Sequence, residues 1–135
     1  MARLAAAKRT VGGRVVRRIA VTLGFPPTLN NLFANVPGVG RVATKEYRLW
    51  QAEASLLLLS QRPGRIEGRF RAVLTFRRPD NHRRDLDNLA KPVLDALVKA
   101  GAIDGDHLAE ELVLRWSELS PSPRGSVTVE LEAMS

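Results

Sequence analysis

The residues most suited to chemistry lie between positions 83 and 91, which read Arg-Arg-Asp-Leu-Asp-Asn-Leu-Ala-Lys. Asp85 and Asp87 offer hard carboxylate oxygens of the kind that Mg²⁺ or Mn²⁺ prefers as ligands. Arg83, Arg84 and Lys91 surround these acids with positive charge, which attracts a phosphate group. Hydrolysis of a phosphodiester needs a cation held by acids within a basic surround. The segment therefore predicts a metal-dependent site for a polyanion.

Pro92 indicates where the helix after these acids begins. Inside a helix, proline removes a hydrogen bond and clashes with the preceding turn, at a cost of about 3 kcal/mol, whereas in the first turn it costs little. We therefore expect a helix that begins near Asp87 or Asn88, with both acids at its N-terminal end and facing one solvent cleft. Lys91 follows Asp87 by four residues, so we expect it to reach the same site and to pair with Asp87 when metal is absent.

Helix capping is the competing interpretation of the same residues. Asp-x-Asp-Asn before an apolar run is also typical of an ordinary N-cap, and an Asp–Lys pair four residues apart contributes only about 0.2–0.5 kcal/mol. A third acid would favour metal binding, and Asp104 and Asp106 are the candidates. Asp-Gly-Asp is also ordinary turn sequence. His107 beside them is a metal ligand, a general base or simply a solvated side chain.

Charge is distributed unevenly along the chain, whose formal net charge is +7. Residues 1–84 hold 17 basic and 4 acidic side chains, whereas residues 85–135 hold 4 basic and 10 acidic ones. This segregation indicates a basic face for a polyanion beside an acidic pocket for a cation, although a GC-rich genome that favours arginine would also enrich the basic residues.

Composition limits the remaining classes of function. The absence of cysteine excludes disulfides, thiolate metal sites and a thiol nucleophile. No apolar run approaches the roughly 20 residues that span a bilayer. We expect a cytoplasmic protein with one domain over residues 14–135 and a basic, flexible tail over residues 1–13.

Periodicity predicts the elements that position the acids. Apolar and polar residues alternate near residues 14–24, 66–76 and 126–132, as is typical of half-buried strands, and a further strand is expected near residues 112–118. Helical spacing predicts one helix from Thr44, as N-cap, to about Ser60, and a second from near Asp87 or Asn88 that ends before Gly101. Residues 28–42 read as loop. The predicted fold is a small α+β domain, with a mixed sheet of about four strands flanked by two helices in the order β-α-β-α-β-β.

These strings together resemble the RusA family of Holliday junction resolvases, which are crossover junction endodeoxyribonucleases. The resemblance covers about residues 15–132, and its most specific part is the segment from Arg83 to Lys91 with Leu94-Asp95-Ala96-Leu97 behind it. Weaker matches are Pro26-Pro27, Asn30-Asn31, Arg41 leading toward Tyr47 and Trp50, Arg77 to Asp80, and Ala100-Gly101.

The resemblance implies a set of site residues. Asp85 and Asp87 match the first two catalytic and metal-binding aspartates of the family, and Lys91 matches its essential lysine. The family's third aspartate usually lies in an Asp-Asp pair, whereas this chain reads Asp104-Gly105-Asp106. Counting from Ala100-Gly101 places Asp106 at that position, with Asp104 as a possible substitute.

The expected function is a Mg²⁺-dependent endonuclease (with Mn²⁺ as a substitute) that resolves four-way DNA junctions by paired nicks in recombination and repair. The resemblance also implies a homodimer, and no organic cofactor or membrane is expected. Arginines are expected to contact the phosphates of branched DNA, namely Arg69, Arg71, Arg77, Arg78, Arg83 and Arg84. The alternatives are a nuclease for flaps or other branches, a catalytically inactive DNA-binding protein of the same fold, and a basic RNA-binding module without metal.

Overall fold

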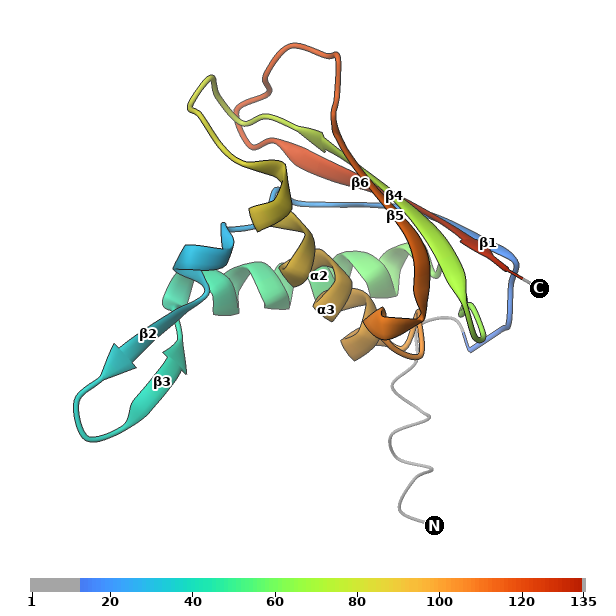
Figure 1. The fold of residues 1–135 in the computed structure, drawn as a ribbon, viewed down its shortest axis with the longest axis horizontal. Helices are drawn as coiled ribbons and strands as arrows, with labels where there is room; N and C mark the ends of the chain where they lie inside the picture. The colour runs from blue at the N-terminus through green and yellow to red at the C-terminus, as the bar shows by residue number, and fades with distance from the viewer. Residues whose placement is uncertain (1–12, 135) are drawn as a thin grey trace.

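A four-stranded mixed sheet forms the centre of the fold, which a computed structural model describes for residues 13–134 (Figure 1). Its strands are β1 (Arg18–Leu23), β4 (Phe70–Arg77), β5 (Ala109–Trp116) and β6 (Ser126–Ala133). They lie in the order β1-β6-β4-β5, with β4 and β5 parallel and the other neighbours antiparallel. The predicted α+β class and mixed four-stranded sheet are confirmed. The predicted tail, apart from Gly13, lies outside the described residues.

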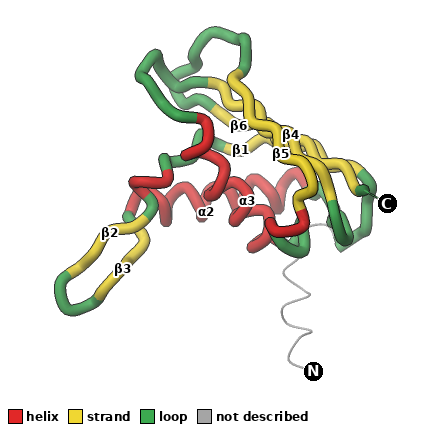
Figure 2. Tube along the Cα trace, viewed as in Figure 1, coloured by secondary structure: helices red, strands yellow, loops and turns green. Residues whose placement is uncertain are grey.

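Both long helices, α2 (Lys45–Gln61) and α3 (Ala90–Ala100), cover the same face of this sheet (Figures 1 and 2). Burial alternates along β1, β4 and β6 as the sequence predicts: in β4, the side chains of Phe70, Ala72, Leu74 and Phe76 are buried. Buried residues of α3 complete the core from the other side, namely Ala90, Pro92, Val93, Leu94 and Leu97. The opposite face of the sheet carries the strands' exposed side chains.

The start of α2 is set by its N-cap, as predicted. The Oγ1 of Thr44 accepts a hydrogen bond from the backbone N–H of Tyr47 (3.1 Å) and donates one to the carbonyl of Asn31 (2.8 Å). Tyr47 and Trp50 are buried, and the indole N–H of Trp50 donates to the carbonyl of Gly24 (3.0 Å). These contacts join α2 to the end of β1 and to the segment that precedes the helix.

The segment predicted to be loop contains a β-hairpin, so that prediction is wrong. Strands β2 (Phe33–Val36) and β3 (Gly40–Ala43) pair antiparallel and stand apart from the main sheet (Figure 2). The turn uses Pro37-Gly38, with Gly38 at φ +77° and a hydrogen bond from the Val39 N–H to the Val36 carbonyl (3.0 Å). Proline followed by glycine is the sequence signature of a type II turn, in which the glycine has a positive φ. The dipeptide Pro37-Gly38 is therefore the feature of the sequence that indicates this hairpin.

Among residues 13–134, no helix combines the length and the apolar character that crossing a bilayer requires.

Candidate active site

Asp85 and Asp87 lie at the entrance to α3, as predicted, but the entrance is tighter than a simple helix start. A 3₁₀ turn, η2 (Leu86–Leu89), precedes α3, and Pro92 occupies the first turn of the α-helix, where it does not break a hydrogen bond. The fully buried Leu89 fixes η2 to the core. The chain therefore holds the two acids on an anchored turn rather than on a free loop.

Neither of these carboxylates acts as a helix cap. Asp85 is the N-cap residue of η2, yet only its backbone carbonyl is used, accepting from the Asn88 N–H (3.2 Å). Within residues 13–134, the side chains of Asp85 and Asp87 form no hydrogen bond and no ion pair, and both are exposed. Capping therefore does not explain these two acids, and their oxygens are available to an external cation.

Lys91 is the link between α3 and the third acid. Its Nζ lies 3.1 Å from Asp95 Oδ1 and 3.1 Å from Asp106 Oδ2. The predicted pair with Asp87 is therefore wrong. Because the α-helix starts only at Ala90, the neighbour of Lys91 four residues away on the same helix face is Asp95, and Asp87 lies in the differently wound 3₁₀ turn. The hydrogen bonds to Asp95 and then Asp106 raise the pKa of Lys91, so it is a cation at neutral pH.

The two candidates for the third acid have separate surroundings. Asp106 begins the short turn η3 (Asp106–Leu108), which packs beside α3. Asp104 instead accepts from the Gly68 N–H (3.2 Å) and lies 3.5 Å from the guanidinium of Arg65. The structure therefore joins Asp106, and not Asp104, to Lys91.

Gly105 lies between the two candidate acids and packs closely against His107. A β-carbon at this buried position would lie 2.5 Å from the imidazole ring of His107. The missing side chain leaves room for His107, which is exposed beside the acids. Its predicted role as ligand or base stays a prediction.

The acids suit Mg²⁺ in chemistry but are not gathered in advance. Within the described residues 13–134, no three Asp, Glu or His side chains form a cluster that could hold a metal ion as they stand. Asp85, Asp87 and Asp106 supply hard oxygen donors, two of them without protein partners and the third held by an ammonium group. A divalent cation at this place would compete with Lys91 for Asp106.

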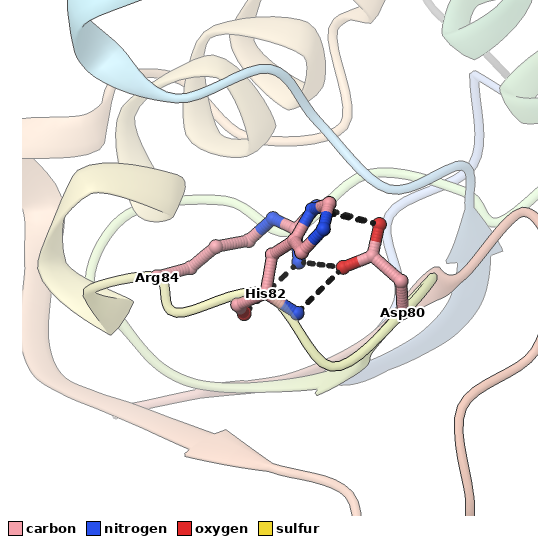
Figure 3. A network of polar contacts seen from close by, with 3 residues as sticks. All are labelled: Asp80, His82 and Arg84. Carbon is pink, nitrogen blue, oxygen red and sulfur yellow. Dashed lines mark hydrogen bonds and ion pairs between the residues drawn. The ribbon is translucent and has the colours of Figure 1, made fainter.

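The loop that leads into η2 is ordered by an ion-pair network (Figure 3). Arg84 donates through Nη1 and Nη2 to the two carboxylate oxygens of Asp80 (2.7 and 3.2 Å), and the His82 N–H also donates to Asp80 (2.9 Å). These bonds, above all the one from Arg84, lower the pKa of Asp80 to about 2. The guanidinium of Arg84 also lies 5.4 Å from the ring centroid of Phe25. Arg84 is thus held near the site by two contacts.

The remaining predicted DNA contacts fall into two groups. Arg77 and Arg78 lie at the end of β4, where Arg77 donates to the Ser120 carbonyl (3.0 Å) and Arg78 stacks 3.8 Å from the ring centroid of Trp116. Arg83 is exposed in the loop before Asp85. These three arginines lie near the entrance to α3 in the chain, and their role in binding DNA stays a prediction.

Arg69 and Arg71 lie elsewhere. Arg71 projects from β4 onto the open face of the sheet, where its guanidinium is 3.1 Å from Glu111 and 3.8 Å from Glu132. Arg69 lies 4.0 Å from Glu110. The structure therefore does not bring these two arginines to the acids at α3, and it pairs both with carboxylates.

Sequence reasoning did not assign roles to Asp80 and Asp95, which hold Arg84 and Lys91. The signal for Asp95 was present, because it follows Lys91 by four residues on a helix. The signal for Asp80 was weaker, because four residues in a loop imply no particular contact.

The family model for endodeoxyribonuclease RusA matches residues 24–132. A crossover junction endodeoxyribonuclease rusA from Enterobacteria phage HK97 is 26% identical over 113 residues, which cover 83% of this chain and 94% of that protein. Every site residue described above lies within the matched range.

Proposed function

The chain belongs to the RusA endodeoxyribonuclease family, and from this premise we propose that it resolves four-way DNA junctions by Mg²⁺-dependent hydrolysis of the backbone. The observation that carries the proposal is the pair of carboxylates, Asp85 and Asp87, which no side chain among residues 13–134 engages, beside the Lys91–Asp106 ion pair. A protein that used these acids only to cap a helix would not leave both without a partner.

Asp85, Asp87 and Asp106 would hold the cation, with Mn²⁺ as a substitute. When bound, Mg²⁺ would supply an activated water and neutralise the charge that builds on the phosphoryl group. Lys91, once released from Asp106, would donate from its ammonium group to a phosphoryl oxygen, while Asp95 would keep that group in place from the next turn of α3.

The arginines of the loop would position the DNA. Arg83 is exposed and Arg84 beside it is oriented by Asp80, and we propose that both contact phosphates near the bond that is cut. Such contacts add affinity that falls with salt and does not depend on sequence.

Two matched nicks require two sites, so the proposal includes a two-fold homodimer acting in recombination and repair. We further propose that this activity is cytoplasmic. Light scattering on the purified protein, alone and with one equivalent of junction, tests the assembly. A monomer in both conditions would contradict it.

One cleavage assay tests the activity. The protein is incubated with a four-way junction, a linear duplex and a flap, each with Mg²⁺ or EDTA, alongside Asp87→Asn. We expect paired, metal-dependent nicks in the junction, whereas Asp87→Asn binds the junction without cutting it. Binding without cutting by the unmutated protein would indicate an inactive DNA-binding member of the family, and equal cutting of all three DNAs would refute junction selectivity.

A further inference from the structure

The β2–β3 hairpin is an exposed arm that the proposed chemistry does not use. It projects from the body of the protein, away from the main sheet (Figure 1). All four residues of β2 are exposed, and β3 is exposed or half-buried. The arm is fixed at its root, where the Thr44 N–H donates to the carbonyl of the buried Leu32 (2.9 Å) and the Phe33 ring packs edge-on against Tyr47 with centroids 5.7 Å apart.

The tip of the arm is apolar. Val36 is 40% exposed and Val39 71% exposed, with Pro37 between them. Hairpin turns usually carry polar residues, so three exposed apolar residues at a rigid turn indicate that something covers them. The turn's Pro-Gly geometry holds the tip in one conformation, which reduces the entropy lost when it is covered.

The charge of the arm selects a polyanion as that partner. The chain contains no Asp or Glu before Glu46. Arg41, on β3, makes no ion pair within residues 13–134, and its guanidinium lies 4.5 Å from the ring centroid of Phe33. An apolar tip on a cationic arm matches nucleic acid whose bases are accessible, because phosphates attract the arm and base faces accept the apolar side chains.

The arm also begins beside the candidate active site. The short turn η1 (Leu29–Asn31), which leads into β2, packs against η2, the turn between Asp85 and α3. Near the root, a cavity of about 220 Å³ is lined by residues of the arm, α2 and α3, Asp95 among them. A strand cut at Asp85 and Asp87 would therefore lie next to the root of the arm.

We propose that the β2–β3 arm inserts its tip, Val36, Pro37 and Val39, between bases at the branch point, with Arg41 contacting a backbone phosphate. Insertion into a continuous duplex requires unstacking of a base step, whereas stacking is already interrupted at a branch. The arm thereby distinguishes branched from linear DNA. This inference rests on the proposed function, since it assigns to that site its means of selecting substrate.

Fluorescence of 2-aminopurine placed beside the branch tests the insertion without any cleavage. Binding is measured in EDTA with the full chain, the double variant Val36→Ser with Val39→Ser, and the matched control Leu56→Ser. Leu56 is 69% exposed on α2, so its substitution removes a comparable apolar surface outside the arm. We expect the unmutated protein and the control to raise the fluorescence, and the double variant to lose most of that rise.

Cleavage and affinity give a second readout. In Mg²⁺, the double variant should cut the junction about tenfold more slowly, equivalent to about 1.4 kcal/mol, while binding linear duplex within about twofold of the unmutated protein. An unchanged fluorescence rise in the double variant would overturn the proposal. A double variant that turns a dimer into a monomer in light scattering would also overturn it, because the tip would then contact a second copy of the chain.

Failure of the proposed function is distinguishable. If the unmutated protein raises the fluorescence but does not nick the junction in Mg²⁺, the arm inserts as proposed and the catalytic assignment is wrong.

Discussion

Asp104 and Asp106 are two residues apart, and the structure predicts that their removal has opposite consequences for stability and for cleavage. Asp104 accepts a hydrogen bond from the Gly68 N–H and pairs with Arg65 across the fold. Among residues 13–134, the carboxylate of Asp106 pairs with Lys91 alone, and Lys91 keeps Asp95 as a second partner. The variants Asp104→Ala and Asp106→Ala should therefore separate a structural acid from a catalytic one.

The stability effects follow from these contacts. Loss of one hydrogen bond and one half-exposed ion pair at Asp104 should lower the free energy of unfolding by about 1–2 kcal/mol, or a few degrees in Tm. The Lys91–Asp106 pair is 53% and 37% exposed on its two sides. Such a pair contributes less than about 1 kcal/mol, so the Tm of Asp106→Ala should lie close to that of the unmutated protein.

The cleavage effects should run the other way. If Asp106 is a metal ligand as proposed, its loss should remove several kcal/mol of charge stabilisation, and about 3 kcal/mol corresponds to roughly a hundredfold loss in rate. Asp106→Ala should show that loss, and Asp104→Ala should cut within about threefold of the unmutated protein.

Single-turnover cleavage of a four-way junction in excess enzyme measures the rates, and thermal unfolding followed by circular dichroism measures stability. Junction affinity in EDTA controls for loss of binding. If Asp104→Ala abolishes cleavage at a temperature where it is folded, while Asp106→Ala remains active, the assignment of the third acid from the Lys91 contact is refuted.

Three further predictions concern the elements that support the site. The pKa of Asp80, measured by carboxyl ¹³C shifts, should lie near 2 and should return toward its usual range in Arg84→Gln. Because the pKa is lowered in the folded state, the stability that this contact contributes is present above about pH 4 and is lost as the pH falls toward 2. Thr44→Ala should cost about 1 kcal/mol in urea unfolding through loss of the α2 cap, and Thr44→Ser should restore it, so an equal loss in both variants would speak against capping. Leu89→Ala should lower the free energy of unfolding by about 2–5 kcal/mol, because the Leu89 side chain is fully buried under η2. Leu56→Ala, on the exposed face of α2, should change it by less than about 0.5 kcal/mol. Similar urea midpoints for the two variants would contradict the packing of η2.

Local patterns predicted the main sheet and the helices because each element carries its own signal. Alternation along β4 identifies its buried face, and Thr44 followed by helical spacing identifies α2. The β2–β3 hairpin was missed because its strands are short and exposed on both faces, so no alternation marks them. Only the Pro37-Gly38 turn carried information about it.

The candidate site was predictable in its residues but not in its pairings. Asp85, Asp87 and Lys91 share one segment, and the placement of the acids at the entrance to α3 followed from Pro92. The partner of Lys91 depends on where the α-helix begins. The α-helix begins about three residues later than predicted, and Lys91 therefore pairs with Asp95 instead of Asp87. Partners far apart in sequence, such as Arg71 and Glu132, are set by strand register, which local periodicity does not specify.

The open face of the sheet has a consequence for how DNA approaches. One row across the four strands reads Arg18, Glu132, Arg71 and Glu111, in register from edge to edge. Neighbouring side chains in this row neutralise one another, so the surplus of +7 on the chain resides elsewhere. The sheet's outer surface therefore contributes little to the long-range attraction of a polyanion, which acts on other parts of the protein.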